Sequence, residues 1–386
     1  MKIAIITDGI SPFMIGGMQQ HSAYLGMNLV NAGHTVDLFH FVAKDQKIPS
    51  TNEVNKFYFN NENGYNRIFC AQFPSSINFP GHYLWNSFKY SSWVNKIICN
   101  DLVKYDFIYS KGFTSWALLK NIKRNKIDVK LGVKFHGYEM FQYAPNFKTK
   151  LQHLMLRPFV RMINNRADFI FSYGGKITNI INSLGVSNRK IIEIPSAIHS
   201  NWLKEKISPP SSIIKFLFVG RYERRKGIQE INESILKLSK KYNNLEFHFL
   251  GPIPKEKQLK IKNIKIIYYG FVKDSLVKKS IYDSCDVLLC PSYSEGMPNV
   301  ILEGMSRGLA VIATDVGAVR LLVSSDNGIL IKNCSEKLIQ KAIIKINSMN
   351  KDLILDMKYS SVNKIKKSFL WNDVIKKIVV SIQKNI

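Results

Sequence analysis

Short apolar runs alternate with helical stretches through the first half of the chain. The run at residues 3–6 leads through a glycine-containing turn into a helical stretch at 18–32, and a second apolar run follows at 34–39. Further runs of the same kind lie at 107–109, 131–135, 169–172 and 191–194. Strands that are apolar on both faces are typical of parallel sheets covered by helices on both sides. The pattern therefore predicts a doubly wound α/β unit over residues 1–198.

The alternation pauses at residues 199–212, where lysine, glutamate, serine and proline predict an exposed linker. It resumes with apolar runs at 213–219, 246–250, 264–269, 287–290 and 310–313. We therefore expect a second doubly wound unit over residues 213–368, so that two Rossmann-like halves face each other across a central cleft. The basic, amphipathic segment at 358–386 predicts a closing helix, whose last part, about 369–386, packs back onto the first unit. Such sheets bind ligands at the carboxyl ends of their strands.

The composition is that of a globular protein with two or three folding units. Of the 386 residues, 46% are hydrophobic and 12% are aromatic, which excludes a disordered, collagenous or disulfide-stapled chain. A formal net charge of +27 favours partners that carry phosphate, such as an anionic lipid, a phosphorylated small molecule or a nucleic acid. Nucleic acid is disfavoured because no recognition motif or aromatic stacking platform accompanies the charge.

The sequence predicts a protein of the cytoplasm. No apolar run approaches the ~20 residues needed to cross a bilayer. Residues 1–7 resemble a signal peptide only superficially, because Asp8 and Gly9 interrupt the run and no small-residue cleavage site follows. The five cysteines are odd in number and lack the spacing of metal ligands, which predicts reduced thiols.

Several common catalytic motifs are absent from the sequence. We find no Gly-x-x-x-x-Gly-Lys-Ser/Thr loop, no Gly-x-Ser-x-Gly, no His-Glu-x-x-His and no Gly-x-Gly-x-x-Gly. P-loop hydrolysis, serine hydrolysis, zinc proteolysis and standard dinucleotide binding therefore lose support. An Asp-x-Asp pair is also absent, which disfavours a diphosphate clamped by a metal ion.

A strong local feature runs from Asp286 to Met305. An apolar strand ends in a loop that holds Glu295, and Pro298 suits the first turn of a helix whose free N–H groups face the cleft. We expect an anion site here. Glu303, about a turn further along, is suited to accept hydrogen bonds from vicinal hydroxyls such as those of a ribose. The alternative is that both glutamates are solvated or cap the helix.

A second feature, residues 218–227, includes the end of the first strand of the second half. Arg221 and Lys226 lie in a loop at the carboxyl end of this strand, where a bidentate guanidinium and an ammonium can hold a diphosphate. In so lysine-rich a chain, an ordinary solvated basic loop is the alternative. The position at the cleft favours the functional interpretation.

Together these segments resemble the retaining glycosyltransferases of family four, which have the GT-B fold. The segment from Gly220-Arg221 to Lys226-Gly227 is similar to the family's Gly-Arg…Lys-Gly loop, and Glu295 with Glu303 is similar to its Glu-x(7)-Glu motif. Further similarities cover nearly the whole chain and lie at Gly16-Gly17, Gly33-His34, His136-Gly137, Ala167-Asp168 and Trp371.

The resemblance implies a site for a nucleoside-diphosphate sugar as the donor. Arg221 and Lys226 would hold the donor's diphosphate and stabilise the charge that develops on the leaving group. Glu303 would bind the ribose hydroxyls, and Glu295 would bind the donor sugar. Neither a further cofactor nor a metal ion is expected.

The resemblance also implies contacts from the backbone and from the first half. Amides at 297–301 would reach sugar and phosphate, and the glycines of the first loop would let it approach the phosphates without a Cβ in the way. His136 would lie across the cleft near the transferred sugar; the alternative is a satisfied histidine at a strand end. The implied donor-binding residues are Gly16, Gly17, Gly220, Gly296, Met297, Pro298, Asn299, Val300, Ile301 and Glu303, and the implied catalytic residues are Arg221, Lys226, Glu295 and His136.

Two segments depart from the family pattern. Relatives often have Pro-Asn-Gly-Val-Asp where this chain has Pro195-Ser196-Ala197-Ile198-His199. They often have an acidic residue after a Gly-Gly turn where this chain has Gly317-Ala318-Val319-Arg320-Leu321. Neither departure removes a proposed ligand of the diphosphate or the ribose, so we expect an active enzyme.

Lysine and arginine are concentrated between residues 111 and 166. This stretch holds twelve of them against two acids, Asp128 and Glu139. Lys150, Arg157 and Arg161 share one face of a predicted helix, with apolar side chains available for another, so the stretch is suited to lie on an anionic membrane. The alternative is a solvated basic face.

The sequence thus predicts a metal-independent, retaining hexosyltransferase that uses a nucleoside-diphosphate sugar. Its acceptor is expected to be a glycan or a lipid-linked glycan of surface polysaccharide or lipopolysaccharide biosynthesis, reached at the inner face of the membrane. The alternatives are a GT-B sugar phosphorylase or sugar-phosphate synthase on soluble substrates, and a non-catalytic binder of glycans or lipid head groups. These motifs do not determine the base, the sugar or the acceptor.

Overall fold

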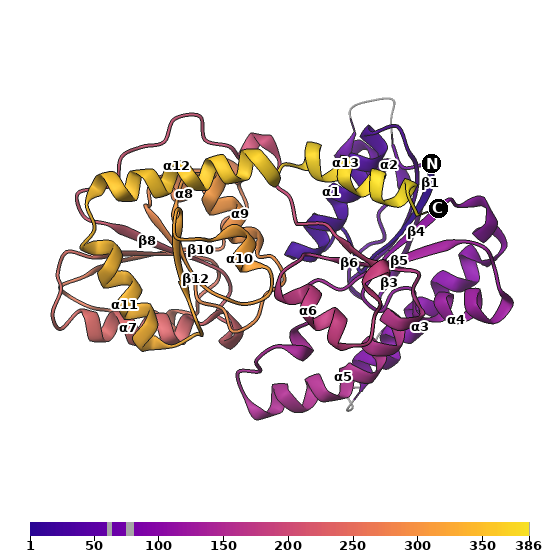
Figure 1. The fold of residues 1–386 in the computed structure, drawn as a ribbon, viewed down its shortest axis with the longest axis horizontal. Coiled ribbons are helices and arrows are strands. Elements are labelled where there is room, and N and C mark those ends of the chain that lie inside the picture. Colours follow the sequence, from indigo (N-terminus) through magenta and orange to yellow (C-terminus); the bar gives the residue numbers. More distant parts are fainter. Residues whose placement is uncertain (60–63, 75–80, 386) are drawn as a thin grey trace.

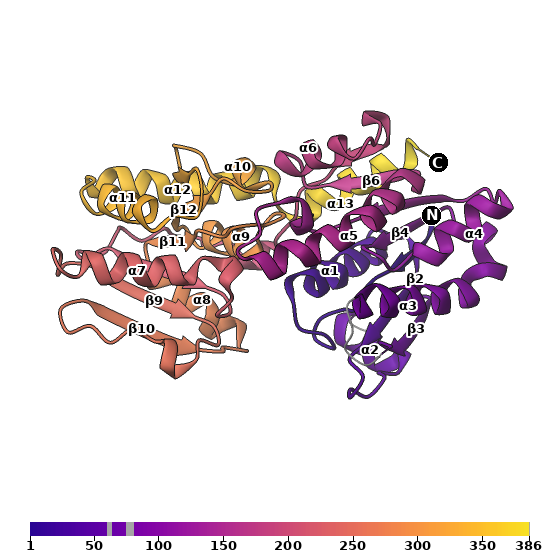
Figure 2. The same ribbon diagram turned by 90° about the horizontal axis from the view of Figure 1, so that it is seen from below.

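The computed structural model describes residues 1–59, 64–74 and 81–385. The chain forms two halves, each built on one parallel sheet with helices on both faces (Figure 1, Figure 2). Both ends of the chain lie at the first half (Figure 1). This arrangement confirms the expected α/β architecture of two doubly wound units.

The first half contains a sheet of seven strands. The strands are β1 (Lys2–Ile6), β2 (Thr35–Val42), β3 (Arg67–Gln72), β4 (Phe107–Lys111), β5 (Lys130–Lys134), β6 (Phe169–Ser172) and β7 (Ile191–Glu193). The helices are α1 (Gly17–Asn31), α2 (Thr51–Tyr58), α3 (His82–Ile98), α4 (Trp116–Asn125), α5 (Phe147–Arg166) and α6 (Lys176–Ser183). The strand order is β3-β2-β1-β4-β5-β6-β7, so it reverses between β1 and β4. Ligand sites of doubly wound sheets lie at such switch points.

The second half contains a sheet of six strands. The strands are β8 (Lys215–Val219), β9 (Glu246–Leu250), β10 (Lys265–Gly270), β11 (Val287–Cys290), β12 (Ala310–Thr314) and β13 (Gly328–Ile331). The helices are α7 (Ile228–Leu238), α8 (Ser275–Asp283), α9 (Asn299–Ser306), α10 (Val319–Leu322), α11 (Glu336–Asn347) and α12 (Lys351–Ser368). The last helix of the chain, α13 (Trp371–Gln383), lies on the first half. The order β10-β9-β8-β11-β12-β13 reverses between β8 and β11.

The apolar pattern did not predict β3 and β13, each of which lies at an edge of its sheet. Five of the six residues of β3 are half-buried and its last residue is exposed, and two of the four residues of β13 are half-buried. An edge strand has a neighbour on one side only, so its side chains are less enclosed and its sequence is less uniformly apolar. The apolar runs identified all the central strands and the other two edge strands, β7 and β10.

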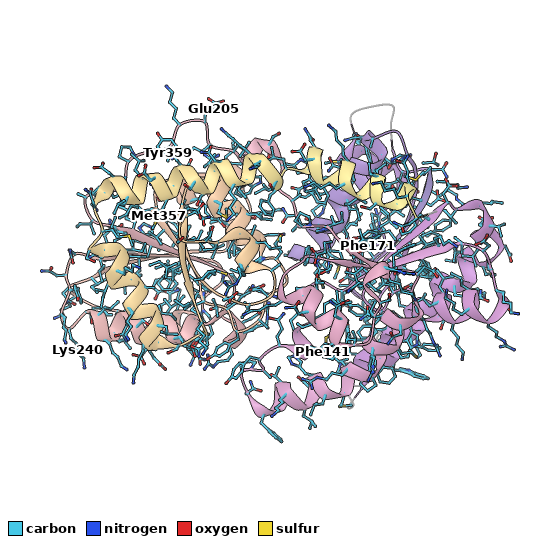
Figure 3. The ribbon with its side chains drawn as sticks, in the orientation of Figure 1. Phe141, Phe171, Glu205, Lys240, Met357 and Tyr359 are labelled. Carbon is cyan, nitrogen blue, oxygen red and sulfur yellow. The ribbon has the colours of Figure 1, made fainter. Side chains whose placement is uncertain are left out.

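The hydrophobic cores lie between each sheet and its helices. On α11, Ile339 and Ile343 stand at helical spacing and both are 0% exposed. Full burial of such a side chain contributes about 1.5–3 kcal/mol. Figure 3 shows Phe171 inside the first half, whereas Glu205 and Lys240 extend into solvent at the rim of the second. These exposed polar residues cover the surface of the second half.

The C-terminal segment is divided into two helices, so the expectation of a single closing helix over 358–386 is wrong. Between α12 and α13, Leu370 forms a parallel bridge with Ile198. Helix α12 packs on α9 of the second half, whereas α13 crosses over to the first half and packs on α1 (Figure 1). Trp371 begins this last helix, is 1% exposed and lies edge-on to His21. The chain thus passes between the halves twice.

The segment at 199–212 is only partly exposed. Trp202 is 8% exposed, and its ring lies edge-on to Tyr282 with centroids 6.0 Å apart. Arg307 donates to the Trp202 backbone oxygen at 3.0 Å. The prediction of an exposed linker is therefore wrong at Trp202, because an aromatic ring anchors this part of the segment to the second half.

No helix in the described part of the chain combines the length and the apolar character that crossing a membrane requires. All five cysteines are free, which confirms the prediction of reduced thiols. Cys285 and Cys290 are buried, and burial raises the pKa of each thiol to about 12. Both thiols are therefore protonated and unreactive at neutral pH.

Candidate active site

The carboxyl ends of the two sheets face each other, and the halves touch there. Gln142 of the first half donates to the backbone oxygen of Glu295 in the second at 2.7 Å. A Cβ at Gly296 would stand 1.9 Å from the backbone oxygen of His136. Any larger residue at this position would push the halves apart, so the close approach requires glycine. The site is therefore built by residues from both halves.

The loop after β8 brings a lysine onto a glutamate. Lys226 Nζ donates to Glu295 Oε1 at 2.6 Å. Arg221, on the same loop, pairs with Glu223 at 2.8 Å and has a side chain that is 73% exposed. The structure thus joins two of the residues that the sequence singled out, and it places Arg221 at the solvent side of the same loop.

A glycine shapes the turn that presents Lys226. Gly227 has a φ of +71°, and a Cβ there would stand 2.3 Å from the backbone oxygen of Pro291. A positive φ strains any residue with a side chain, and the close contact with the loop after β11 leaves no room for one. This position therefore couples the two loops that carry Lys226 and Glu295.

Glu295 is a buried carboxylate that stays charged. Burial alone would raise its pKa, but the charges of Lys226 and Arg225 hold the pKa below the ordinary value of a glutamate. Arg225 also donates to the backbone oxygen of Ser294 at 3.0 Å. The sequence analysis did not single out Arg225, because nothing in a run of three basic residues distinguishes it from Arg224.

Glu303 lies on α9, is 5% exposed and has two partners from α8. Lys278 Nζ donates to Oε1 at 2.8 Å, and the Tyr282 hydroxyl donates to Oε2 at 2.6 Å. Together they hold the carboxylate in one orientation and leave lone pairs for vicinal hydroxyls. Lys278 and Tyr282 carry no local sequence signal, because their role follows from how α8 packs beside α9.

Residues 298–301 form the boundary and first turn of α9. Asn299 Oδ1 accepts a hydrogen bond from the Ser196 hydroxyl at 3.3 Å. Met297 is 5% exposed, and its sulfur accepts a hydrogen bond from the Ser196 N–H at 3.1 Å. The start of this helix is therefore tied to the first half, at the level of the cleft.

The glycines of the first loop lie at the same place. Gly16 directly precedes α1 and Gly17 begins it, and a Cβ on Gly17 would stand 3.4 Å from Asn299 Nδ2. A Cβ on Gly16 would stand 2.2 Å from Gln19 Oε1. Gly220 directly follows β8. These glycines therefore lie at the switch points of the two sheets, and Gly17 approaches the opposite half.

His136 follows β5 and keeps one ring nitrogen without a partner. The Tyr173 hydroxyl lies 2.8 Å from Nδ1, whereas Nε2 is buried and has no hydrogen bond with any described residue. Burial, and then the charges of Lys111 and Lys134, keep the pKa of His136 well below its usual value, so the ring is neutral. The described residues therefore satisfy Nδ1 and leave Nε2 without a partner.

Two lysines of the basic stretch at 111–166 are buried. Lys111 is 2% exposed and Lys134 is 0% exposed. Arg157 is half-buried and donates to the backbone oxygen of Met140 at 2.7 Å. The expectation that this whole stretch forms one basic face is therefore wrong, because charge along the sequence does not show which side chains the fold encloses.

The two segments that depart from the family pattern lie at the contact between the halves. Ser196 is the residue that bonds Asn299. Gly317 has a φ of +53°, and a Cβ there would stand 2.1 Å from the backbone oxygen of Glu295. Both segments therefore support the loops of the site, and neither separates Lys226 from Glu295.

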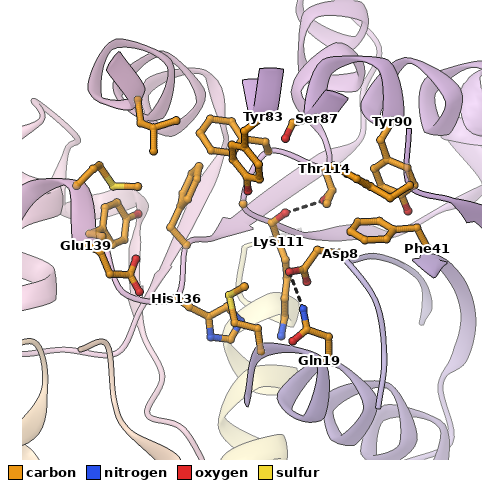
Figure 4. A pocket seen from close by; sticks show the side chains of 18 of the residues that line it. Asp8, Gln19, Phe41, Tyr83, Ser87, Tyr90, Lys111, Thr114, His136 and Glu139 are labelled. Atoms are coloured by element: carbon orange, nitrogen blue, oxygen red, sulfur yellow. Dashed lines mark hydrogen bonds between the residues drawn. The ribbon is translucent and has the colours of Figure 1, made fainter. Parts of the chain in front are cut away.

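A cavity of about 480 Å³ opens beside His136 in the first half (Figure 4). Asp8 and Lys111 line it together with aromatic side chains that include Tyr83 and Tyr90. Sequence reasoning did not select Asp8 or Lys111 as site residues. Lys111 ends β4 and Asp8 lies two residues after β1, which is the one signal that was available.

Known families match most of the sequence. Residues 15–202 match the family described as Glycosyltransferase Family 4, and residues 214–348 match the family described as Glycosyl transferases group 1. The chain belongs to the group 1 glycosyltransferases of family 4. The resemblance seen in the motifs is thus confirmed, and the enzyme class with it.

Among curated proteins, this glycosyltransferase is similar to Bacillus subtilis TuaC, which is named for teichuronic acid biosynthesis. The identity is 32% over 37% of this chain and 35% of that protein, so the match spans about a third of TuaC. An uncharacterized glycosyltransferase of Methanocaldococcus jannaschii is 24% identical over 81% of this chain and 83% of its own. The Campylobacter jejuni N,N'-diacetylbacillosaminyl-diphospho-undecaprenol alpha-1,3-N-acetylgalactosaminyltransferase is 23% identical over 61% of this chain and 59% of its own.

Solved structures share the fold over the whole length. Sucrose-phosphate synthase from Thermosynechococcus elongatus has a TM-score of 0.76 at 15% identity and covers 99% of this chain and 98% of its own. Anabaena HepE in complex with UDP has a TM-score of 0.67 at 15% identity and covers 100% of both chains. At these identities the similarity shows the fold alone, which is GT-B.

Proposed function

We propose that this glycosyltransferase moves a hexose-type sugar from a nucleoside-diphosphate sugar to a glycan or lipid-linked acceptor, with retention of configuration and without a metal ion. The observation that carries the proposal is the contact of Lys226 with Glu295 at 2.6 Å, with Arg221 on the same loop and Glu303 on the helix that follows. This set combines cations for a diphosphate with carboxylates for hydroxyl groups at the ends of parallel strands.

The two cations meet the charge of the leaving diphosphate. Lys226 has three N–H donors, so its bond to Glu295 leaves others for phosphate oxygens. Arg221 is held only by an exposed ion pair with Glu223, and such pairs contribute about 0–1 kcal/mol. Its guanidinium can therefore turn to the phosphates at little cost. Positive charge placed where negative charge develops lowers the barrier to transfer, and it supplies here what a divalent ion supplies elsewhere.

The remaining groups fit the hydroxyls of the donor. Glu303, oriented by Lys278 and Tyr282, has free lone pairs for the two ribose hydroxyls. Glu295 accepts from hydroxyls of the transferred sugar. His136 lines the cavity in the first half, and its Nε2 has no partner among the described residues; this atom carries the ring proton when Nδ1 accepts from Tyr173. Retention rests on the resemblance to the retaining enzymes of family four.

The acceptor class is supported by the names of the relatives. One is named for teichuronic acid biosynthesis, and another for an acceptor that carries diphospho-undecaprenol. We therefore place this transferase in the biosynthesis of a surface glycan, with an acceptor that is carried on a lipid at the inner face of the membrane.

Helix α5 is the surface that fits such a membrane. Its exposed apolar side chains are Phe147, Leu151, Leu154 and Met155, and its exposed cations are Lys148, Lys150, Arg161 and Arg166. Apolar side chains that enter the lipid beside cations that meet anionic head groups are the features of a helix that binds a membrane surface. Each cation near an anionic surface adds about 1 kcal/mol.

Transfer itself tests the function. Thermal shifts with a panel of nucleoside diphosphates identify the base, and the matching sugar nucleotides are then assayed for hydrolysis and transfer with and without excess EDTA. We expect cleavage of one donor, full activity in EDTA and a product with the anomeric configuration of the donor by NMR. Loss of activity in EDTA that manganese restores contradicts metal independence. Cleavage that requires inorganic phosphate favours a phosphorylase, and binding without turnover favours a non-catalytic binder.

Sedimentation with liposomes tests the membrane contact. We expect binding to anionic vesicles at low salt and release at high salt, because surface charges are screened beyond about 8 Å at physiological ionic strength. Replacing Lys148, Lys150 and Arg161 together with glutamine should abolish it. A triple variant that sediments fully, or binding that ignores lipid charge, contradicts this part of the proposal.

A further inference from the structure

The cavity beside His136 has two chemically different ends. It lies at the carboxyl ends of the central strands of the first half and has a volume of about 480 Å³. Figure 4 shows Lys111 running toward Gln19 and His136 at one end, while Tyr83, Tyr90 and Phe41 stand at the other. Aromatic rings are suited to the apolar face of a sugar ring, so the polar end decides which substituent the sugar carries.

Lys111 is a buried cation without an ion pair. Its Nζ donates to His21 Nδ1 at 2.9 Å, and no carboxylate in the described part of the chain lies within 4.0 Å of it. The nearest candidate, Asp8, is bonded to Thr7 Oγ1 at 3.1 Å and to Gln19 Nε2 at 3.0 Å instead. An ammonium has three donors, so Lys111 keeps donors that no described residue uses, in a side chain that lines the cavity.

A second buried lysine lies beside Lys111 and has its contacts within the protein. Lys134 of β5 is the register partner of Lys111 on β4. Its Nζ donates to the Ile194 backbone oxygen at 3.3 Å and lies 3.8 Å from the centre of the Tyr173 ring. Burial, and then the charge of Lys111, lower the pKa of Lys134 well below its usual value, so these contacts hold a side chain whose charged form is disfavoured. Lys134 does not line the cavity, and Lys111 does.

We propose that this cavity binds an acidic sugar, a pyranose that carries a carboxylate or a phosphate, and that Lys111 is the cation that binds the acidic group. The proposal rests on the proposed function, because the acidic sugar would be part of the acceptor to which the donor sugar is transferred. Lys111 then acts as a specificity-determining residue, since a neutral sugar would leave its ammonium without a partner. A site built to pair a polar group discriminates strongly against ligands that lack the matching group.

The groups that face Lys111 supply little negative charge. Burial lowers the pKa of Lys134 on β5, of His21 on α1 and of His136 after β5 well below the usual values, so the two rings are neutral. The facing carboxylate is Asp8, in the loop after β1, and burial raises its pKa. Glu139 lines the rim of the cavity and forms no ion pair with Lys111. Burial lowers the pKa of Lys111 to about 7. An anion beside the ammonium raises that pKa again, so binding above neutral pH takes up a proton.

Three probes that share a pyranose ring test the proposal. Glucuronic acid, glucose 6-phosphate and glucose differ at C6, where they carry a carboxylate, a phosphate and a hydroxymethyl group. Their affinities for the full chain are measured at pH 6 by ligand-observed NMR. We expect one or both acids to bind about ten- to a hundredfold tighter than glucose, the size of a hydrogen bond to a charged group. A preference confined to one acid identifies the source as carboxylate or phosphate.

Matched variants separate a binding role from a structural one. Lys111→Met should remove the preference for acids and leave the affinity for glucose, whereas Lys120→Met, on the exposed face of α4, should change neither. Calorimetry at pH 8 in two buffers should show proton uptake with the acidic probe in the native chain and none in the variant. Lys111→Gln replaces Lys111→Met if the latter does not fold. If neither variant folds, the comparison of the three probes in the native chain still tests the proposal.

Two results overturn the proposal. One is equal affinity of the native chain for glucose and both acids, and the other is equal weakening of glucose and the acids by Lys111→Met. Failure of nucleoside diphosphates to bind refutes the proposed function instead and leaves the preference for acidic sugars intact. The two failures are therefore distinguishable.

Discussion

The two halves of the molecule bury lysines in different ways. In the second half, Lys358 of α12 is 4% exposed and pairs with Asp286 at 3.0 Å. That carboxylate precedes β11 and also accepts hydrogen bonds from the Ser211 and Lys215 backbone N–H groups. In the first half, Lys111 is as deeply buried, at 2%, and no carboxylate in the described residues reaches it within 4.0 Å.

The difference separates a structural charge from one that is available to a ligand. A buried pair supplies its own counter-ion, so it holds α12 to the sheet and offers nothing to a solute. A buried ammonium that lines a cavity and keeps unused donors can bind an anionic ligand. Lys226, in the loop after β8, combines features of both lysines. It is paired with Glu295, but its side chain is 20% exposed and so remains accessible to a ligand.

The largest expected effect is on the structural pair. Lys358→Met leaves Asp286 as a buried carboxylate without its cation, and the free energy of unfolding of the second half should fall by about 3–5 kcal/mol. Lys366→Met, on an exposed position of the same helix, should stay within about 0.5 kcal/mol. Denaturant unfolding of the purified variants measures both. A loss below about 1 kcal/mol for Lys358→Met would remove the contrast between the two buried lysines.

The next effect is on catalysis. Arg221→Ala and Lys226→Ala should each lower kcat/KM by on the order of 10²–10³, as when one charge-stabilising donor is lost. Folding should survive, because both side chains lie on a loop. Steady-state kinetics with the identified donor measure the change, and Lys240→Ala, exposed and distant from the loop, is the control. Near-normal turnover by both variants would contradict the assignment of the diphosphate site.

A smaller effect separates the two carboxylates. Glu303→Ala should weaken binding of the nucleoside diphosphate by about ten- to a hundredfold, because hydrogen bonds to a charged group contribute about 1.5–3 kcal/mol. Glu295→Ala should chiefly impair transfer of the sugar. Calorimetry with the nucleoside diphosphate alone compares the two variants. Equal loss of affinity in both variants would contradict the assignment of the ribose to Glu303 and of the donor sugar to Glu295.

A further effect is on the stability of the first half as a function of pH. Burial lowers the pKa of Lys111 to about 7 from the 10.5 of an unfolded lysine, so the unfolded chain binds more protons between these values and stability rises with pH there. Lys111→Met removes the cost of burying the charge. Its melting temperature should exceed that of the native chain by about 2–4 °C for each ~1 kcal/mol removed, most at pH 6. The gain should shrink toward pH 10, and a constant difference across this range would indicate a packing effect.

The sequence predicted the design of both halves from their central strands. Runs such as 3–6 and 287–290 are apolar on both faces, which is possible only for strands covered on both sides, and parallel strands end at one edge of a sheet. The motif residues Lys226 and Glu295 lie in the loops after β8 and β11, and Glu303 lies on the helix after the second of these loops, so their placement at the cleft was predictable from local sequence. The edge strands β3 and β13 were not, because half-buried positions do not require apolar residues.

Only the tertiary structure decided which polar side chains are enclosed and what they meet. In the sequence, Lys111 and Lys134 belong to a basic stretch and were expected to be surface charges. They are buried because α1 and α13 cover the ends of the strands that carry them. Lys278 reaches Glu303 from another helix, 25 positions earlier in the chain. Strand burial follows from residues next to each other in sequence, whereas the partner of a charge is set by the packing of elements that are distant in sequence. The sequence therefore determined the frame and the donor motifs, and the packing of side chains across both halves determined the cavity that lies opposite them.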